Sequence, residues 1–158
     1  MQPALVLAAD TAAAVVALGE RLGRVLEVGD VIGLLGPLGA GKTTLVQGIA
    51  RGMGIDGRHV ASPTFALVNE HPGPVPLVHA DLYRIEDARE LDELGLGEAC
   101  DRAAVAVEWL DRFPNALPAD RLEIEIAIEA EDRRRLAFHV KGERAAALVT
   151  RLRSSQES

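Results

Sequence analysis

Nine consecutive residues carry the most readily identified chemistry of this chain. They read Gly-Pro-Leu-Gly-Ala-Gly-Lys-Thr-Thr and run from residue 36 to residue 44. Glycines allow backbone conformations that other residues avoid, so successive N–H groups can point inward and form a nest for an anion. The spacing GxxxxGK(S/T) is that of a P-loop, which binds the phosphates of a nucleoside triphosphate. We call residues 36–44 the P-loop segment.

Two residues of this segment have distinct expected roles. Lys42 is expected to reach the β and γ phosphates, and the hydroxyl of Thr43 is expected to bind the Mg²⁺ that bridges them. The backbone of the segment should cradle the same phosphates at the start of a helix. The expected nucleotide-binding residues are therefore Leu38, Gly39, Ala40, Gly41, Lys42, Thr43 and Thr44.

The residues on either side supply the elements that a P-loop needs. Residues 31–35 are apolar and rich in β-branched side chains, which predicts a buried strand. Leu45, Ile49 and Met53 recur at helical spacing and predict a helix over 43–53. Strand, loop and helix in this order are the context that supports the motif.

Apolar periodicity predicts the remaining elements. A residue at 10 or 11 caps a first helix, residues 86–94 form a short acidic helix, and the chain closes with a helix that carries Leu148 and Leu152. Strands are predicted over 4–8, 65–69, 74–82, 103–107, 122–128 and 136–140. The last two alternate strictly and form an antiparallel hairpin through 130–134. We expect an α/β fold: a P-loop NTPase-like mixed sheet, flanked by helices, with this hairpin at its C-terminal edge.

Two acidic residues end predicted strands. Asp81 lies near the end of the strand over 74–82, and Glu108 directly follows the buried run 103–107. In P-loop proteins an acid in such a place commonly holds the Mg²⁺ shell. We expect both to be catalytic and to lie at the metal, but the spacing leaves open which of them binds Mg²⁺ and which orients water.

Composition limits the class of protein. A chain of 158 residues with 48% hydrophobic content fits one folded domain over residues 1–158. The formal net charge of −7 argues against an autonomous DNA- or RNA-binding protein. Apolar stretches are too short to span a membrane, so we expect no membrane anchor. The single Cys100 fits a reducing compartment, and the expected location is the cytoplasm.

Four blocks follow one another along the chain: the P-loop segment, SPTF at 62–65, HADLYR at 79–84 and VEW at 107–109. In this order they resemble the TsaE family, the small ATPase component of the bacterial machinery that makes threonylcarbamoyladenosine in tRNA. The resemblance spans about residues 5–140. It implies ATP and Mg²⁺ as ligands and the TsaD and TsaB subunits as partners, with tRNA reached indirectly through that complex. It also implies hydrolysis that is slow alone and stimulated by the partners.

The resemblance also implies roles for individual residues. Ser62 and Thr64 would belong to a switch loop, with Thr64 offering its hydroxyl to the γ phosphate or Mg²⁺. Asp81 would take the Walker-B-like role, and Glu108 would order water or metal. The catalytic set is then Lys42, Thr64, Asp81 and Glu108. For His79, a structural hydrogen bond and a functional role remain equal alternatives.

Other classes of nucleotide-dependent protein have motifs of their own, which can be compared with this sequence. A GTPase needs NKxD and DxxG motifs, and an ABC-type ATPase needs an LSGGQ-like signature; the chain has neither. A small-molecule kinase remains an alternative, with arginines of the run 133–135 acting as a lid, although we interpret that run as a solvated hairpin turn. A non-catalytic module whose nucleotide state only sets its affinity for partners remains the third possibility.

Overall fold

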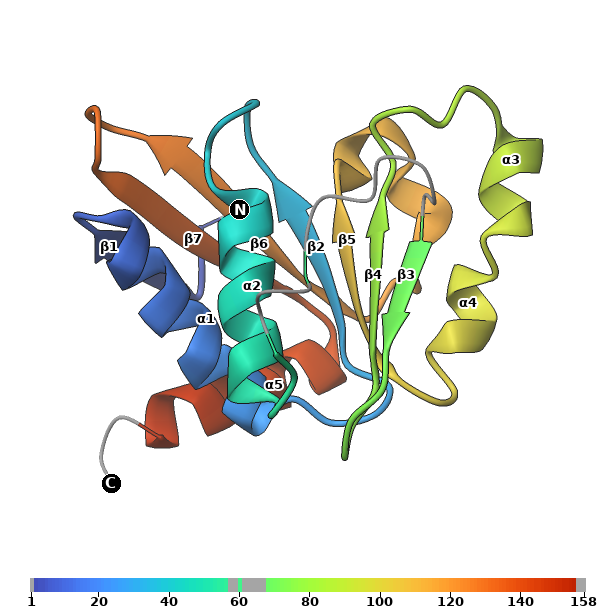
Figure 1. The fold of residues 1–158 in the computed structure, drawn as a ribbon, viewed down its shortest axis with the longest axis horizontal. Coiled ribbons are helices and arrows are strands. Elements are labelled where there is room, and N and C mark those ends of the chain that lie inside the picture. Colours follow the sequence, from blue (N-terminus) through green and yellow to red (C-terminus); the bar gives the residue numbers. More distant parts are fainter. Residues whose placement is uncertain (1, 57–59, 61–67, 156–158) are drawn as a thin grey trace.

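The computed structural model describes residues 2–56, 60 and 68–155, and its described strands form one seven-stranded sheet (Figure 1). Its order is β1-β7-β6-β2-β5-β4-β3. β2 is parallel to β5 and β6, and β4 is parallel to β5, whereas β1–β7, β6–β7 and β3–β4 are antiparallel. The strands are β1 (Leu5–Ala9), β2 (Val31–Leu35), β3 (Val68–His71), β4 (Leu77–Asp81), β5 (Ala104–Glu108), β6 (Arg121–Ile128) and β7 (Arg134–Lys141). The predicted mixed sheet and its C-terminal hairpin are confirmed, but β1, which pairs with β7, forms the edge of the sheet instead of the hairpin.

Helices cover both faces of this sheet. The helices are α1 (Ala12–Val25), α2 (Lys42–Gly52), α3 (Ala88–Glu93), α4 (Leu96–Ala99) and α5 (Glu143–Ser154), with short 3₁₀ turns at Leu110–Arg112 and Pro114–Ala116. α1, α2 and α5 enclose one hydrophobic cluster, and α4 with the 3₁₀ turns encloses the other. Because helices lie on both faces, β2, β4 and β5 are buried throughout or nearly so, which explains their continuous apolar sequences.

The packing of α1 on α2 depends on glycines that periodicity did not single out. Each lies where an added Cβ would come within 2.1–2.5 Å of a carbonyl oxygen of the facing helix. The two helix backbones therefore touch directly, and α1 supports the helix that follows the P-loop segment. The four glycines are Gly19 and Gly23 of α1 and Gly48 and Gly52 of α2.

Element boundaries differ from the sequence expectations in several places. β1 and β3 end one and two residues later than predicted, and residues 65–67 of the expected third strand lie outside the described residues. β4 begins only at Leu77, because Pro74 and Pro76 lack the N–H that a strand donates. A second short helix, α4, was not predicted. Gly95 adopts a left-handed φ of 66°, which ends the α3 region and starts α4 at the next residue.

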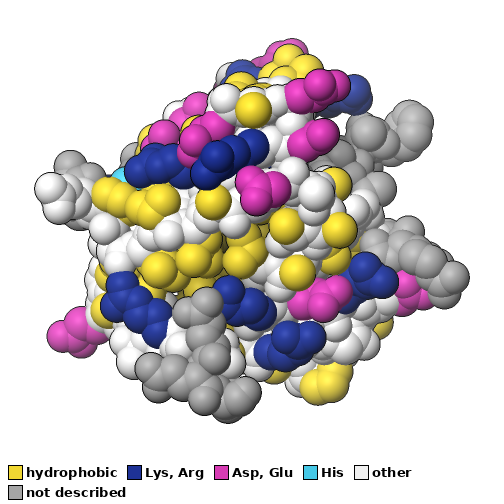
Figure 2. All heavy atoms as spheres, turned by 90° about the vertical axis from the view of Figure 1, so that its left-hand side faces the viewer, with side chains coloured by type: hydrophobic (Ala, Val, Ile, Leu, Met, Phe, Trp, Pro, Cys, Tyr) yellow, Lys and Arg dark blue, Asp and Glu magenta, His cyan; other side chains and the backbone are white. Residues whose placement is uncertain are grey.

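The outer edge of β1 faces the viewer in Figure 2. A band of hydrophobic side chains crosses this face between groups of Lys and Arg side chains, and acidic side chains lie among them. Val6 of β1 is 43% exposed and belongs to this open edge. None of the helices in the described part of the chain has the length and apolar character needed to cross a membrane.

Candidate functional site

The P-loop segment leaves the carboxyl end of β2 and leads into the first turn of α2 (Figure 1). Three of its glycines have positive φ values: 148° at Gly36, 82° at Gly39 and 108° at Gly41. A Cβ at Gly36 would lie 2.5 Å from the carbonyl oxygen of Ile126, so the loop passes tightly over β6 there. Apart from their chain neighbours, the described residues place no atom within 4 Å of a Cβ built on Gly39 or Gly41. These two glycines are therefore required for conformation, and the space beside them is open.

Among the described residues, no side chain caps the N-terminus of α2. Its N-cap residue is Gly41, which has no side chain to accept the N–H groups of the first turn. The positive end of the helix dipole adds to these N–H groups, so an anion is favoured at this position. An open helix N-terminus after a glycine-rich turn is a phosphate-binding geometry.

Lys42 is buried and folds back over its own loop. Its Nζ atom donates hydrogen bonds to the carbonyl oxygens of Gly36 (2.6 Å) and Pro37 (2.9 Å). The same Nζ lies 3.9 Å from the ring centroid of Trp109, which places a cation over an aromatic face. Burial lowers the pKa of Lys42, against the opposing effect of the nearby carboxylates, of which Glu108 is the strongest.

Thr43 joins the P-loop segment to the end of β5. Its hydroxyl lies 3.0 Å and 3.1 Å from the two carboxylate oxygens of Glu108, and it donates to that carboxylate. Glu108 is 2% exposed, and a second contact, from His79 of β4, reaches its Oε2 atom. The predicted metal residues Thr43 and Glu108 thus meet directly, although 65 positions separate them in the chain.

Asp81 lies beside Glu108 at the same edge of the sheet. The two residues are register partners at the carboxyl ends of β4 and β5. Asp81 is 8% exposed, and its Oδ1 atom accepts the backbone N–H of Tyr83 at 2.9 Å. This local hydrogen bond fixes the turn after β4 and orients the carboxylate. Lys42, Thr43, Asp81 and Glu108 are therefore brought together, as the sequence predicted.

Trp109 is held in an unusual backbone conformation directly after Glu108. Its φ of 62° is the only positive value found for a non-glycine among the described residues. Its ring lies 5.0 Å from that of Tyr83, centroid to centroid, and Tyr83 is half exposed. Positive φ at a bulky residue costs conformational energy, and such strain clusters at functional sites. The aromatic pair forms a wall of the site next to Lys42.

Arg134 is a site residue that sequence reasoning placed wrongly. The sequence predicts a solvated hairpin turn over 133–135, and this holds for Arg133, whereas Arg135 is exposed but lies in β7. Arg134 instead begins β7 and donates from Nε to the carbonyl oxygen of Ala40 at 3.0 Å. The sequence did contain the signal: position 134 alternates with the buried positions 136 and 138, so its side chain points to the same face as theirs.

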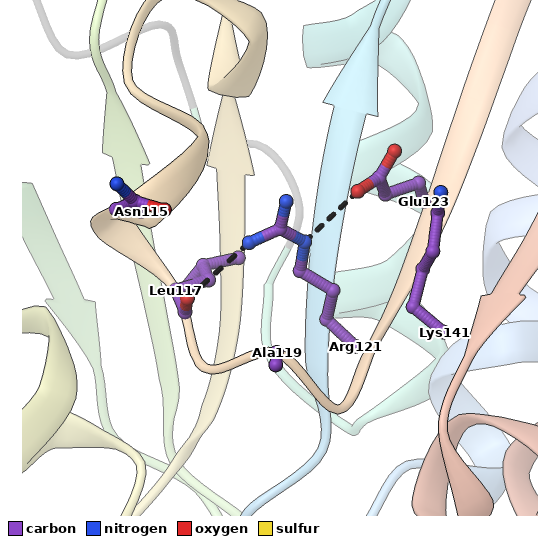
Figure 3. A pocket seen from close by; sticks show the side chains of 6 residues that line it. All are labelled: Asn115, Leu117, Ala119, Arg121, Glu123 and Lys141. Atoms are coloured by element: carbon purple, nitrogen blue, oxygen red, sulfur yellow. Dashed lines mark hydrogen bonds and ion pairs between the residues drawn. The ribbon is translucent and has the colours of Figure 1, made fainter.

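Arg134 also lines a cavity of about 130 Å³ next to the P-loop segment. Its other walls come from the first turn of α1, from the turn between β6 and β7, and from the start of α2. A larger cavity, of about 270 Å³, lies at the start of β6 and the end of β7, where Arg121, Glu123 and Lys141 point into it (Figure 3). None of the predicted site residues lines that larger cavity.

The remaining predicted residues differ in how far the structure tests them. Leu38, at the tip of the P-loop segment, is 78% exposed, whereas Ala40 is fully buried beneath it. Ser62 and Thr64 lie outside the described residues. Their assignment to a switch loop therefore stays a prediction.

The residues at the site fit Mg²⁺ by the chemistry of their donor atoms. Thr43, Asp81 and Glu108 offer only oxygen, which is the ligand type that Mg²⁺ prefers. In the described part of the chain, no group of three or more His, Cys, Asp or Glu side chains is arranged to hold a metal by itself. A few protein oxygens completed by phosphate and water is the usual Mg²⁺ arrangement at nucleotides.

The fold and this site define a class: α/β proteins in which a glycine-rich loop joins a parallel strand to an open helix N-terminus beside two carboxylates. The sequence model of the family "Threonylcarbamoyl adenosine biosynthesis protein TsaE" matches residues 9–136. This chain therefore belongs to the TsaE family.

Individual relatives agree with this assignment. The tRNA threonylcarbamoyladenosine biosynthesis protein TsaE of Bacillus subtilis is 45% identical over 118 residues, which cover 73% of each chain. The protein of the same name from Streptomyces coelicolor is 42% identical over 114 residues, covering 69% of this chain and 76% of the relative. Among solved structures, the crystal structure of YdiB from Bacillus subtilis superposes with a TM-score of 0.79 at 30% identity, covering 98% of this chain and 96% of that one.

Proposed function

We propose that this protein binds ATP with Mg²⁺ and hydrolyses it as an accessory protein in the biosynthesis of threonylcarbamoyladenosine in tRNA. The observation that carries the proposal is the contact between Thr43 and Glu108. It joins the hydroxyl that a P-loop offers to Mg²⁺ to a buried acid on the neighbouring strand. The names of the TsaE relatives supply the pathway.

Phosphate binding follows from the open end of α2. The backbone N–H groups of the P-loop segment would bind the β and γ phosphates, while Lys42 would exchange its contacts with the Gly36 and Pro37 carbonyls for phosphate oxygens. The buried Lys42 cation lacks most of its hydration, so an anion should bind it strongly. Thr44, one residue further along α2, would contact the phosphate nearest the ribose.

The metal site would use oxygens from the P-loop segment and from the two strand-end carboxylates. Thr43 would supply a direct oxygen ligand, and Asp81 and Glu108 would supply oxygens to the metal or to its bound water. Mg²⁺, when bound, neutralises charge on the transferring phosphoryl group. The residue that orients the attacking water is expected to be Glu108 or Asp81, and Thr64 would approach the γ phosphate from the switch loop.

The nucleoside would occupy the cavity between α1 and the β6–β7 turn. That cavity shares Gly39, Gly41 and Thr44 with the P-loop segment, so it continues directly from the phosphate nest. At about 130 Å³ it is too small to enclose a whole nucleoside, which would remain partly exposed. Asp132 and Arg134 supply the polar groups at its outer wall.

The partners are expected to be TsaD and TsaB, with tRNA entering through their complex in the cytoplasm. The net charge of −7 supports this indirect route, since a direct RNA-binding surface needs clustered positive charge. Hydrolysis is expected to be slow in the isolated protein and faster when the partners are present. Partners that bind one nucleotide state increase the population of that state.

Phosphate release from ATP tests this function. The purified protein is assayed with Mg²⁺ and with EDTA, alone, with TsaD and TsaB, and with tRNA alone. We expect slow Mg²⁺-dependent release that the protein pair accelerates. Phosphorylation of an added acceptor would instead identify a kinase, and binding of ATP without release would identify a nucleotide-gated module. Stimulation by free tRNA, with no response to the protein pair, would contradict the accessory role.

A further inference from the structure

His79 forms the shortest side-chain contact at the site. Its Nε2 atom lies 2.5 Å from Oε2 of Glu108, and the exposed fractions of the two side chains are 0% and 3%. His79 occupies the middle of β4 and shares a sheet face with Leu77 and Asp81. Glu108 is therefore held from two sides: from α2 by the Thr43 hydroxyl and from β4 by His79.

The second ring nitrogen of His79 determines where the proton lies. Nδ1 is buried and has no hydrogen-bond partner among the described residues. A proton on Nδ1 would leave a buried donor unpaired, and a bare Nε2 would face the carboxylate with a lone pair. The tautomer with its proton on Nε2 avoids both costs. In this tautomer His79 donates to Glu108 and accepts nothing.

This hydrogen bond restricts a flexible carboxylate. A glutamate side chain has three rotatable bonds, and an untethered Glu108 would distribute between orientations that do and do not meet Thr43. His79 fixes Oε2, and the remaining contacts of the carboxylate are then directed at the Thr43 hydroxyl and the open end of α2. Groups that orient a functional side chain in this way commonly affect activity as strongly as some direct contacts do.

We propose that His79 is a positioning residue, which holds Glu108 in the orientation required for ATP hydrolysis. The inference deepens the proposed function and rests on it. Packing alone gives a weaker account of His79: its neighbours Leu77, Val78 and Ala80 on β4 are all apolar and buried. If packing were the only requirement, an apolar residue could fill this position without burying the unpaired Nδ1 nitrogen of His79.

Two substitutions separate positioning from packing. His79→Leu fills much of the space but removes the donor, whereas His79→Gln can place an amide N–H close to the position of Nε2. We expect His79→Leu to lower kcat about 10- to 100-fold with little change in KM for ATP. His79→Gln should recover most of this loss. Equal impairment of the two variants, or a kcat unchanged in His79→Leu, would overturn the proposal.

A double-mutant cycle tests whether the effect passes through Glu108. His79→Leu is measured alone and in the Glu108→Gln background. If His79 acts by orienting the carboxylate, His79→Leu should lower kcat only slightly in the Glu108→Gln background, where the carboxylate is already gone. Additive losses would show that His79 acts elsewhere and would contradict the proposal.

Nitrogen NMR of the histidine rings provides a measurement that does not depend on turnover. Spectra of nucleotide-free protein labelled with ¹⁵N-histidine are compared with those of His79→Gln, which identifies the resonances of His79. We expect a proton on Nε2 and none on Nδ1; a proton on Nδ1 would overturn the inferred geometry. If the wild-type protein releases no phosphate, the proposed function fails, and these resonances still decide whether His79 holds Glu108 as described.

Discussion

Buried polar side chains lie at both ends of β2, and they differ in the hydrogen-bond partners that the fold gives them. At the amino end, the Asp30 carboxylate accepts hydrogen bonds from the backbone N–H of Glu27 (2.8 Å), from Arg144 Nε (2.9 Å) and from Arg151 Nη2 (2.7 Å). Every donor comes from the chain itself. At the carboxyl end, Lys42 donates its hydrogen bonds to two carbonyl oxygens of its own loop.

The helices at these two ends show the same contrast. The first N–H groups of α5 donate to the Asp120 carboxylate, from Arg144 at 2.9 Å and from Ala145 at 3.0 Å. An acid from elsewhere in the chain thus occupies the N-terminus of α5. The N-terminus of α2, at the opposite end of the sheet in Figure 1, has no side-chain cap. Polar groups that the fold satisfies itself stabilise it, and those that it leaves open are where we propose that a ligand binds.

The largest effect is expected from Lys42→Ala. This change removes the full charge that we propose faces the phosphates, so turnover should fall by about a thousandfold, at the upper end of what one preorganised donor contributes. The described contacts of Lys42 are two loop carbonyls and the face of Trp109, and none of them joins core elements through an apolar contact, so the fold should remain intact. ATP hydrolysis and circular dichroism on the same preparation check both parts. Wild-type turnover in the folded variant would contradict the P-loop assignment.

The acids should show a smaller and more selective effect. Glu108→Gln and Asp81→Asn keep the size of each side chain but remove its charge. We expect turnover to fall by about a hundredfold and ATP affinity by much less, because these groups act on charge that develops in the transition state. Single-turnover kinetics and calorimetric titration separate the two quantities. Normal hydrolysis in both variants would show that the catalytic acids lie elsewhere.

Asp30→Asn is the matched change at the other end of β2. It weakens two ion pairs and a backbone hydrogen bond around a side chain that is 1% exposed. Arg144 and Arg151 are partly exposed and can regain water, so we expect a loss of about 2 kcal/mol in the free energy of unfolding. Turnover per folded molecule should not change. Loss of turnover without loss of stability would break the contrast between the ends.

The smallest effect is expected from Arg134→Ala. The guanidinium supports the Ala40 carbonyl, so its removal should weaken ATP binding by about tenfold, the equivalent of one hydrogen bond to a charged group. Arg133→Ala and Arg135→Ala are the controls, since both side chains are exposed in the same run. Equal ATP affinities in all three variants would show that Arg134 has no role at the site and would favour the solvated turn that the sequence predicted.

Local sequence patterns were sufficient for much of the fold. The N-cap Thr11 accepts the N–H of Ala14 at 3.0 Å as a capping residue should, and the alternating residues of β6 and β7 pair as expected. The meeting of Thr43 with Glu108 was also anticipated, because parallel strands bring their carboxyl ends to one edge.

Features that depend on contacts distant in sequence were not predictable in the same way. The pairing of β1 with β7, the role of Asp120 at α5 and the contact of Arg134 with Ala40 each join segments whose proximity no local pattern encodes. For His79, the alternation with Asp81 gave the correct sheet face, but its partner Glu108 became evident only from the register of β4 with β5.

Hydrogen–deuterium exchange with and without a non-hydrolysable ATP analogue and Mg²⁺ tests the central claim most directly. The account predicts slower exchange at the N–H groups of residues 36 and 38–44 when the analogue is bound, with no change at residues 120–123 and 143–151 around the other end of β2. Lys42→Ala should lose this protection. Unchanged exchange at 36–44, or protection centred on the cavity beside Arg121 and Lys141 in Figure 3, would contradict the account.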